Sequence, residues 1–270
     1  MPPTTELLTL LRPLIDAPER AAIFLDVDGT LAPIVEQADR ARVPENTARL
    51  LGTLGRRFAI VACVSGRSAT ETRRLVGVGS LAYAGYHGAE LLMPGTPRPW
   101  QLPELEHGAD RVRRFALEQD EGSDLRVLRV RLEDKGPIFA FHWRGVPDEE
   151  AAQARMEQVA QAAEGEGLRT HWGRKVLEVR PAVEIDKGQA VRRILDERRA
   201  SAALFAGDDR TDLDGFAALE ELREEGRLET AIRVGIVSDE GPPEVAQRAD
   251  LCVEGVAGFA EVLTLLAGQP

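Results

Sequence analysis

One stretch of sequence decides the fold of this chain: Ile23-Phe24-Leu25-Asp26-Val27-Asp28-Gly29-Thr30-Leu31. An apolar run ends there in two carboxylates and a glycine. Residues i and i+2 of a strand lie on the same side, so Asp26 and Asp28 can converge on one small volume. Two like charges this close repel each other unless a cation lies between them or one holds a proton. The pattern predicts a site for a hard divalent ion; the alternative is a strand that ends in a plain Asp-Gly turn.

Strands and helices alternate on both sides of this stretch. We expect buried strands at 22–27, 58–64, 81–85, 202–206 and 231–237. We expect helices at 4–16, 44–54, 69–76, 187–199 and 212–224. Continuous apolar strands joined through helices indicate an α/β fold with a parallel sheet.

The middle of the chain has a different pattern. Residues 125–132 and 138–144 alternate apolar and polar, which is typical of half-exposed antiparallel strands. We also expect a helix at 148–163 and strands at 168–171 and 175–180. The sequence therefore predicts a core domain of residues 1–97 and 182–270, interrupted by a smaller α+β domain of residues 98–181.

Composition limits the classes of function. The 270 residues are 43% hydrophobic and 29% charged, which suits a globular protein of one large or two moderate domains. A net charge of −11 argues against nucleic acid or an anionic membrane as the main partner, but not against a small anionic substrate. Cys63 and Cys252 lie far apart in apolar contexts, as reduced thiols do. With neither a signal peptide nor a membrane span in the sequence, we expect a cytoplasmic monomer.

Polar motifs follow three of the predicted core strands, and a fourth opens a helix. In open α/β sheets ligands bind at the carboxyl ends of the strands, so these motifs should face one crevice. Taken singly, each has a structural explanation as a turn, a helix N-cap or a solvated first turn. Together they suit phosphoryl transfer, which needs a metal site beside phosphate-binding donors. The motifs are Asp26–Thr30, Ser65-Gly66-Arg67, Asp186-Lys187-Gly188 and Gly207-Asp208-Asp209-Arg210-Thr211-Asp212.

In this order the four motifs resemble those of haloacid dehalogenase superfamily phosphatases. The inserted segment is more specific and resembles trehalose-6-phosphate phosphatases, as does the segment Ala84–Glu90 that leads into it. The resemblance implies a Rossmann-like core with a mobile α+β cap that closes over a disaccharide phosphate. The motifs of the inserted segment are Leu132–Gly136, Phe141–Arg144 and Gly173–Pro181.

The resemblance also implies roles for the core residues. Asp26 would be the nucleophile that forms an aspartyl-phosphate, and Asp28 the acid/base. A carboxylate that attacks phosphorus in line needs a second group to protonate the departing sugar oxygen and later to deprotonate water. Mg²⁺ would be held by Asp26, the backbone carbonyl of Asp28 and Asp208. Asp209 and Asp212 would orient its waters.

The phosphoryl oxygens and the sugar would be bound by further groups of both domains. For the phosphoryl group these are Ser65, Arg67, Lys187 and the amides of Asp28 and Gly29. For the sugar the family pattern points to His87, Glu133, Lys135, His142, Arg144, Lys175 and Glu178, with Arg174 as an alternative to Lys175. Structural explanations remain for some: Glu133 and Lys135 flank a hairpin turn, and His87 precedes a glycine.

The function implied is Mg²⁺-dependent hydrolysis of trehalose 6-phosphate. One rival is a phosphatase for another sugar phosphate, such as sucrose phosphate or a glycosyl phosphoglycerate. A second rival is a noncatalytic sugar-phosphate sensor, which would have no need of the nucleophile Asp26 or the acid Asp28.

Overall fold

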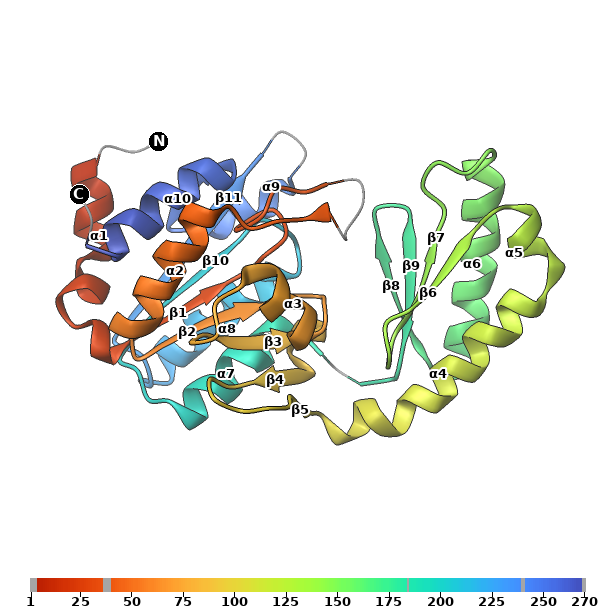
Figure 1. Ribbon diagram of the computed structural model, residues 1–270, viewed down its shortest axis with the longest axis horizontal. Helices are drawn as coiled ribbons and strands as arrows, with labels where there is room; N and C mark the ends of the chain where they lie inside the picture. The colour runs from red at the N-terminus through yellow and green to blue at the C-terminus, as the bar shows by residue number, and fades with distance from the viewer. Residues whose placement is uncertain (1–3, 36–39, 184, 239–240, 269–270) are drawn as a thin grey trace. The chain divides into compact units, whose positions relative to one another are not determined.

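The computed structural model describes residues 4–35, 40–183, 185–238 and 241–268 (Figure 1). Over this part the chain divides into two compact units. Unit 1 is discontinuous and comprises Met1–Trp100 and Ile185–Pro270, and unit 2 comprises Gln101–Glu184. None of the described helices is long and apolar enough to cross a membrane.

Unit 1 is built on a large sheet with the strand order β12-β11-β10-β1-β2-β3-β4-β5. The six strands from β12 to β3 are paired in parallel, and β4 pairs antiparallel to β3. The α/β fold with a mostly parallel sheet is therefore confirmed. The strands are β1 (Ala21–Leu25), β2 (Ile60–Val64), β3 (Ala82–Gly85), β4 (Glu90–Leu92), β5 (Trp100–Gln101), β10 (Ala202–Gly207), β11 (Thr230–Val237) and β12 (Leu251–Glu254).

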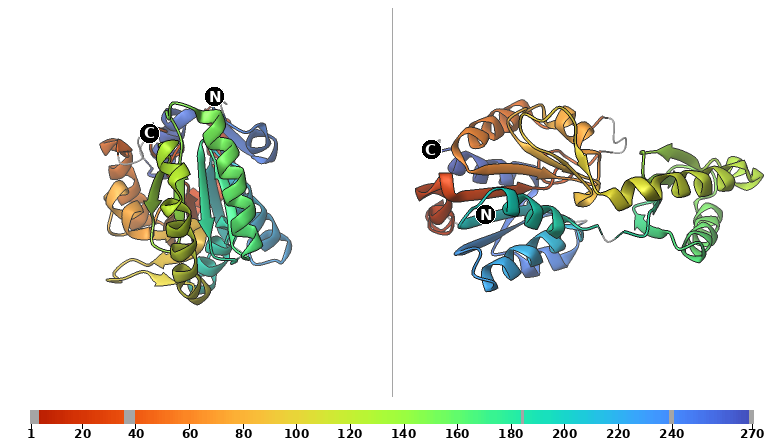
Figure 2. Two further views of the ribbon diagram at one scale, coloured as in Figure 1. Left: turned by 90° about the vertical axis from the view of Figure 1, so that its right-hand side faces the viewer. Right: turned by 90° about the horizontal axis from the view of Figure 1, so that it is seen from below.

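Helices cover both faces of this sheet (Figure 2). On one face lie α1 (Thr4–Asp16), α2 (Glu45–Arg57), α3 (Ala69–Val76) and α10 (Gly255–Leu266). On the other lie α7 (Lys187–Glu197), α8 (Asp212–Glu224) and the short α9 (Pro243–Arg248).

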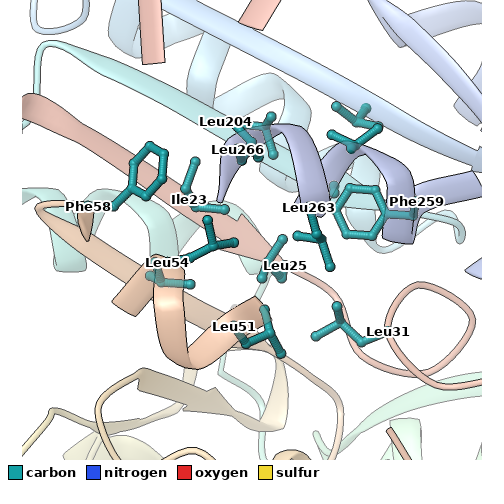
Figure 3. Close-up of a cluster of buried hydrophobic side chains, with 14 of the residues drawn as sticks. Ile23, Leu25, Leu31, Leu51, Leu54, Phe58, Leu204, Phe259, Leu263 and Leu266 are labelled. Carbon is teal, nitrogen blue, oxygen red and sulfur yellow. The ribbon is translucent and has the colours of Figure 1, made fainter. Parts of the chain in front are cut away.

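The apolar run before Asp26 forms β1 because both of its faces are buried. Every residue of β1 is buried, and alternate residues enter different apolar clusters. Ile23 and Leu25 pack with Leu54 and Phe259 of α2 and α10 (Figure 3). Phe24 instead enters the cluster beneath α7 and α8. Burial from both sides fixes the register of β1, and thereby the point at which its carboxylates emerge.

Unit 2 is a four-stranded antiparallel sheet with the order β6-β7-β9-β8, covered on one face by helices. Its apolar core joins Phe139, Phe141, Leu177 and Val179 of the sheet to these helices. The alternate residues of β7 and β9 therefore lie on the face opposite the helices. The elements are α4 (Pro103–Glu121), α5 (Ser123–Val127), β6 (Arg131–Asp134), β7 (Phe139–His142), α6 (Glu149–Gly165), β8 (Arg169–Gly173) and β9 (Val176–Arg180).

The structure corrects one predicted strand and adds elements. The strand predicted at 125–132 begins only at Arg131, because the residues before it form α5 and a turn. Leu125 and Leu128 are three residues apart and both pack on the core of unit 2, which is a helical spacing. The apparent alternation came from Leu125 with Val127, but Val127 is exposed. Helix α4, which was not predicted, buries only Leu105, Val112, Phe115 and Ala116 of its 19 residues. Such a polar helix carries little apolar signal.

Candidate active site

The polar motifs of unit 1 meet at the carboxyl ends of its central strands. β1 lies between β10 and β2, and Leu25 at its end pairs with Ala206 on one side and Cys63 on the other. The amide of Asp26 continues this ladder by donating to the carbonyl of Ala206 (2.9 Å). The order of the sheet changes direction at β1, which is the point where α/β sheets open a crevice for ligands.

Lys187 is buried between two carboxylates. Its Nζ atom lies 2.6 Å from Oδ1 of Asp26 and 2.7 Å from Oδ1 of Asp212. Burial disfavours its charge, but the two carboxylates outweigh burial, so the pKa of Lys187 lies above its ordinary value. Lys187 opens α7, where Asp186 caps the helix by accepting from the amide of Gln189 (2.8 Å). The helix start therefore sets where the ammonium points.

Three carboxylates crowd around this single ammonium. One oxygen from each of Asp26, Asp208 and Asp212 lies within 4.8 Å of the others. Burial raises the pKa of Asp26 well above its ordinary value, with Asp212 and Asp208 adding to the rise and Lys187 opposing it. Burial, together with Asp212, raises the pKa of Asp208 to about 6. The cluster thus carries more negative charge than Lys187 neutralises, and its all-oxygen donor set fits a hard divalent cation.

The two oxygens of Asp212 are both used within the protein. Oδ1 accepts from Lys187, and Oδ2 accepts from the backbone amides of Asp208 (3.0 Å) and Asp209 (2.9 Å). Asp212 therefore fixes the loop that presents Asp208. The side chain of Asp209 is exposed.

Two residues of the turn after β1 determine the position of the Asp208 carboxylate. Oδ1 accepts a hydrogen bond from the hydroxyl of Thr30 (3.0 Å), which is fully buried. Gly29 has φ +100°, and a Cβ there would lie 2.0 Å from Oδ2 of Asp208. Glycine is needed at this position both for its backbone conformation and for the approach of the carboxylate.

Asp28 is held by Arg67 through two parallel hydrogen bonds. Nε donates to Oδ2 (2.8 Å) and Nη2 donates to Oδ1 (2.7 Å). The sequence assigned Arg67 to the phosphoryl group, whereas the structure places its guanidinium on the predicted acid/base. Ser65 is buried beside it, and its Oγ accepts from the amide of Arg67 (3.2 Å).

The loop Ser65–Arg67 is braced by a backbone segment in an uncommon conformation. Tyr86 and His87 both have positive φ, 47° and 59°. Their amides donate to the carbonyls of Arg67 and Ser65, each over 2.9 Å. The ring of His87 packs on Gly66, where a Cβ would lie 2.9 Å from Nε2. Left-handed conformations are unfavourable for such residues, and here the two hydrogen bonds to the loop offset that cost.

In unit 2, four of the predicted sugar residues lie together. His142 Nε2 lies 2.7 Å from Oε2 of Glu133, and Lys135 Nζ donates to Oε1 of Glu178 (2.9 Å). The hydrogen bond from His142 lowers the pKa of Glu133. Glu133 and Glu178 pair with opposite sides of Ala140, so the two acids stand on the same face of the sheet with a small residue between them. This is the face opposite the helices.

Arg144 and Lys175 lie apart from that group, around the β8–β9 turn. Lys175 has φ 58° and forms an ion pair with Glu149 at the start of α6. Arg144 donates to the carbonyl of Arg174 (3.2 Å).

Sequence reasoning missed some of these contacts. Thr30 lies in the first motif without an assigned role, and Glu149 belongs to no motif; only the structure shows what they touch. One overlooked signal lies in composition, since the chain has just three lysines among 34 basic residues. Because the other basic residues are arginines, composition alone could have singled out Lys135, Lys175 and Lys187 as candidate functional residues.

Comparison with known proteins agrees with this geometry. The trehalose-phosphatase family model matches residues 24–254. Trehalose 6-phosphate phosphatase RA3 of Zea mays is 30% identical over 283 residues, covering 97% of this chain and 74% of the maize protein. Probable trehalose-phosphate phosphatase G of Arabidopsis thaliana is 30% identical over 225 residues, covering 75% of this chain and 59% of the relative. The chain thus spans about three-fifths of the length of some curated relatives.

Solved structures share the fold. The C-terminal domain of a Candida albicans trehalose-6-phosphate phosphatase has a TM-score of 0.75 at 20% identity, over 98% of this chain and 97% of that one. A haloacid dehalogenase-like hydrolase of Bacteroides thetaiotaomicron has a TM-score of 0.62 at 13% identity, over 91% and 99%. Because the family model spans most of the sequence and the maize relative is matched over most of both chains, this chain belongs to the trehalose-phosphatase family.

Proposed function

We propose that the chain hydrolyses trehalose 6-phosphate to trehalose and inorganic phosphate. The observation that carries this proposal is the buried ion cluster in which Lys187 joins Asp26 to Asp212 beside Asp208. A purely structural ion pair would be satisfied by one carboxylate. Here two buried carboxylates and the partly buried Asp208 lie at the carboxyl ends of the central strands, which is the arrangement expected of a site for a cation and a phosphoryl group.

In the first half of the proposed reaction, a carboxylate oxygen of Asp26 attacks phosphorus. The bond from phosphorus to the sugar oxygen breaks, and its electron pair leaves with that oxygen. Asp28 donates a proton to the oxygen, so that trehalose departs neutral. The hydrogen bond from Lys187 to Oδ1 holds the attacking carboxylate in one rotamer.

In the second half, water attacks the aspartyl-phosphate. Asp28, now ionised, takes a proton from the water as its oxygen bonds to phosphorus, and the bond from phosphorus to Asp26 breaks. This restores the carboxylate of Asp26 and the protonated form of Asp28, and releases phosphate. Lys187, the hydroxyl of Ser65 and the amide of Asp28 bind the phosphoryl oxygens in both halves. The amide of Gly29, also predicted to bind them, donates to the carbonyl of Ala32 over 2.7 Å and would have to exchange that partner.

Mg²⁺ would be held by Asp26, Asp208 and the backbone carbonyl of Asp28. When bound, it would neutralise charge on the phosphoryl oxygens. Both oxygens of Asp212 already accept hydrogen bonds, so we propose that it orients the waters of the ion and is not itself a ligand. We assign the same role to Asp209, whose side chain is exposed.

For the sugar, we propose that unit 2 acts as the cap and that its polar sheet face supplies the recognition. On this face Glu133 is paired with His142, and Lys135 with Glu178. Side chains held in this way offer fixed hydrogen-bond donors and acceptors to hydroxyl groups. Arg144, Lys175 and, in unit 1, His87 complete the proposed sugar contacts. We further propose that the protein acts as a monomer, which size-exclusion chromatography with light scattering tests.

The test of the function is a phosphate-release panel with purified protein and Mg²⁺. The substrates are trehalose 6-phosphate, sucrose 6-phosphate, a glucosyl phosphoglycerate and glucose 6-phosphate. We expect kcat/KM for trehalose 6-phosphate to exceed the others by at least tenfold, and Asp26→Asn to abolish release from all of them. Equal rates across the panel would contradict the substrate, and undiminished activity of Asp26→Asn would contradict the covalent mechanism.

A further inference from the structure

We propose that Arg67 is a positioning residue for the acid/base Asp28, and not a ligand of the phosphoryl group. This inference rests on the proposed function, because it assigns Arg67 a task in the leaving-group step of that reaction. It rests on the two-point contact between the two side chains.

The contact has the geometry by which arginine fixes the plane of a carboxylate. Nε and Nη2 of Arg67 each donate to a different oxygen of Asp28, at 2.8 and 2.7 Å. Two parallel bonds remove the freedom of the carboxylate to rotate, which one bond would leave. Only arginine offers this fork, because the ammonium of lysine is a point donor.

The backbone of Arg67 is itself held by hydrogen bonds at its amide and at its carbonyl. Its amide donates to Oγ of Ser65 over 3.2 Å, and its carbonyl accepts from the amide of Tyr86 over 2.9 Å. Tyr86 belongs to the left-handed segment described above. The guanidinium therefore starts from a fixed backbone, and the chain of contacts from Tyr86 through Arg67 ends on Asp28.

The two-point contact with Arg67 leaves Asp28 able to act as an acid and a base. A carboxylate oxygen has two lone-pair sites, and Arg67 uses one site on each oxygen of Asp28. The remaining sites can carry the proton for the departing sugar oxygen and accept one from water. Arg67 would thus orient Asp28, much as the aspartate of a hydrolase triad orients its histidine. The cationic contact to the phosphoryl group is already available from the ammonium of Lys187.

A double-mutant cycle tests the proposal with trehalose 6-phosphate as substrate. Arg67→Gln should lower kcat/KM about 10- to 100-fold, a fraction of what a whole general acid contributes. In the Asp28→Asn background the same change should have less than a threefold effect, because Arg67 acts only through Asp28. Equal losses in both backgrounds would overturn the proposal.

Three further measurements separate orientation from phosphate binding. The competitive inhibition constant of inorganic phosphate should change less than twofold in Arg67→Gln, and Arg67→Lys should stay as impaired as Arg67→Gln. With p-nitrophenyl phosphate, whose leaving group needs little protonation, kcat/KM should fall less than threefold. A tenfold increase in the inhibition constant of phosphate, or activity restored in Arg67→Lys, would show that Arg67 binds the phosphoryl group.

The matched control is Arg12→Gln, because Arg12 forms only an exposed ion pair with Asp16 on α1. It should leave every constant unchanged. Thermal melts of all variants show whether they fold. If Asp28→Asn proves as active as the wild type, the proposed mechanism fails at Asp28 itself, which is distinct from a failure at Arg67.

Discussion

Nζ of Lys187 lies 2.6 Å from Oδ1 of Asp26, although the two residues are 161 positions apart in the chain. The side chains are only 3% and 8% exposed. A contact of this kind ties the start of α7 to the end of β1, and it serves both the fold and the proposed chemistry.

Lys187→Met should lose both stability and activity. The substitution leaves Asp26 and Asp212 buried without their cation, and breaking a buried pair in this way costs about 3–5 kcal/mol. Urea denaturation should show a loss of that size, and phosphate release should fall below detection. Lys175→Met is the matched control for stability, because Lys175 is 44% exposed; it should cost under about 1 kcal/mol. A similar small loss at Lys187 would contradict the burial argument.

The contribution of Asp208 to the stability of the metal-free protein should fall as pH rises from about 4 to 7. The pKa of Asp208 is raised from 3.8 to about 6, so in this window the folded state keeps a proton that the unfolded state releases. The free energy of unfolding therefore decreases with pH until Asp208 is ionised in both states. Denaturation in EDTA at a series of pH values measures this slope.

Two changes should remove that slope. Asp208→Asn has no proton to lose at this position, so its unfolding free energy should vary less between pH 4 and 7 than that of the wild type. Saturating Mg²⁺ favours the ionised carboxylate and should stabilise the protein more at pH 7 than at pH 5. The idea fails if the wild type and Asp208→Asn show the same slope.

Gly29→Ala should abolish phosphate release. The new Cβ would lie 2.0 Å from Oδ2 of Asp208, so the carboxylate must move from its place beside Asp26. Gly95→Ala is the control, since Gly95 also has a positive φ, 83°, but has open space around the added atom. It should cost only the backbone strain of about 1–2 kcal/mol and retain full activity. Comparable activity in the two variants would refute the role of the close approach.

Glu178→Gln should raise KM for trehalose 6-phosphate about tenfold and leave kcat/KM for p-nitrophenyl phosphate unchanged. The amide keeps the shape of the side chain but weakens its contact with Lys135, and the aryl substrate has no sugar to recognise. Steady-state kinetics with both substrates measures the difference. Glu164→Gln, on the helical side of unit 2 and bonded to Thr170, is the control. An equal loss with both substrates would remove Glu178 from sugar recognition.

The sequence was enough to predict the parts of the fold that depend on local pattern. The apolar run of β1, buried on both faces, predicted a parallel strand, and the carboxylates after it predicted the site. The motif order then predicted that Lys187 and Asp208 would join Asp26. These predictions depend only on the topology, because the carboxyl ends of parallel strands lie at the same edge of the sheet.

The remaining contacts depend on side-chain directions that no pattern encodes. Whether Arg67 points at Asp28 or at a ligand depends on how the Ser65–Arg67 loop is braced, and the brace is a left-handed turn at Tyr86 and His87. Helix α5 was predicted as strand because Leu125 and Val127 alternate with polar residues, although Val127 is exposed in the structure. In both cases the deciding interactions lie far away in the chain.

The position of β1 between β10 and β2 has a consequence for biosynthesis. On the ribosome, β1, β2 and β3 emerge early, but the strand that covers the other edge of β1 follows only after all of unit 2 has been translated. Until then, a wholly apolar strand has one open hydrogen-bonding edge, the kind of surface that aggregates or recruits chaperones. The sheet of unit 2 is formed from consecutive sequence, so all of its strands are available before the sheet of unit 1 can be completed. Slowing translation beyond residue 184 should therefore burden the cell more than slowing it within unit 2.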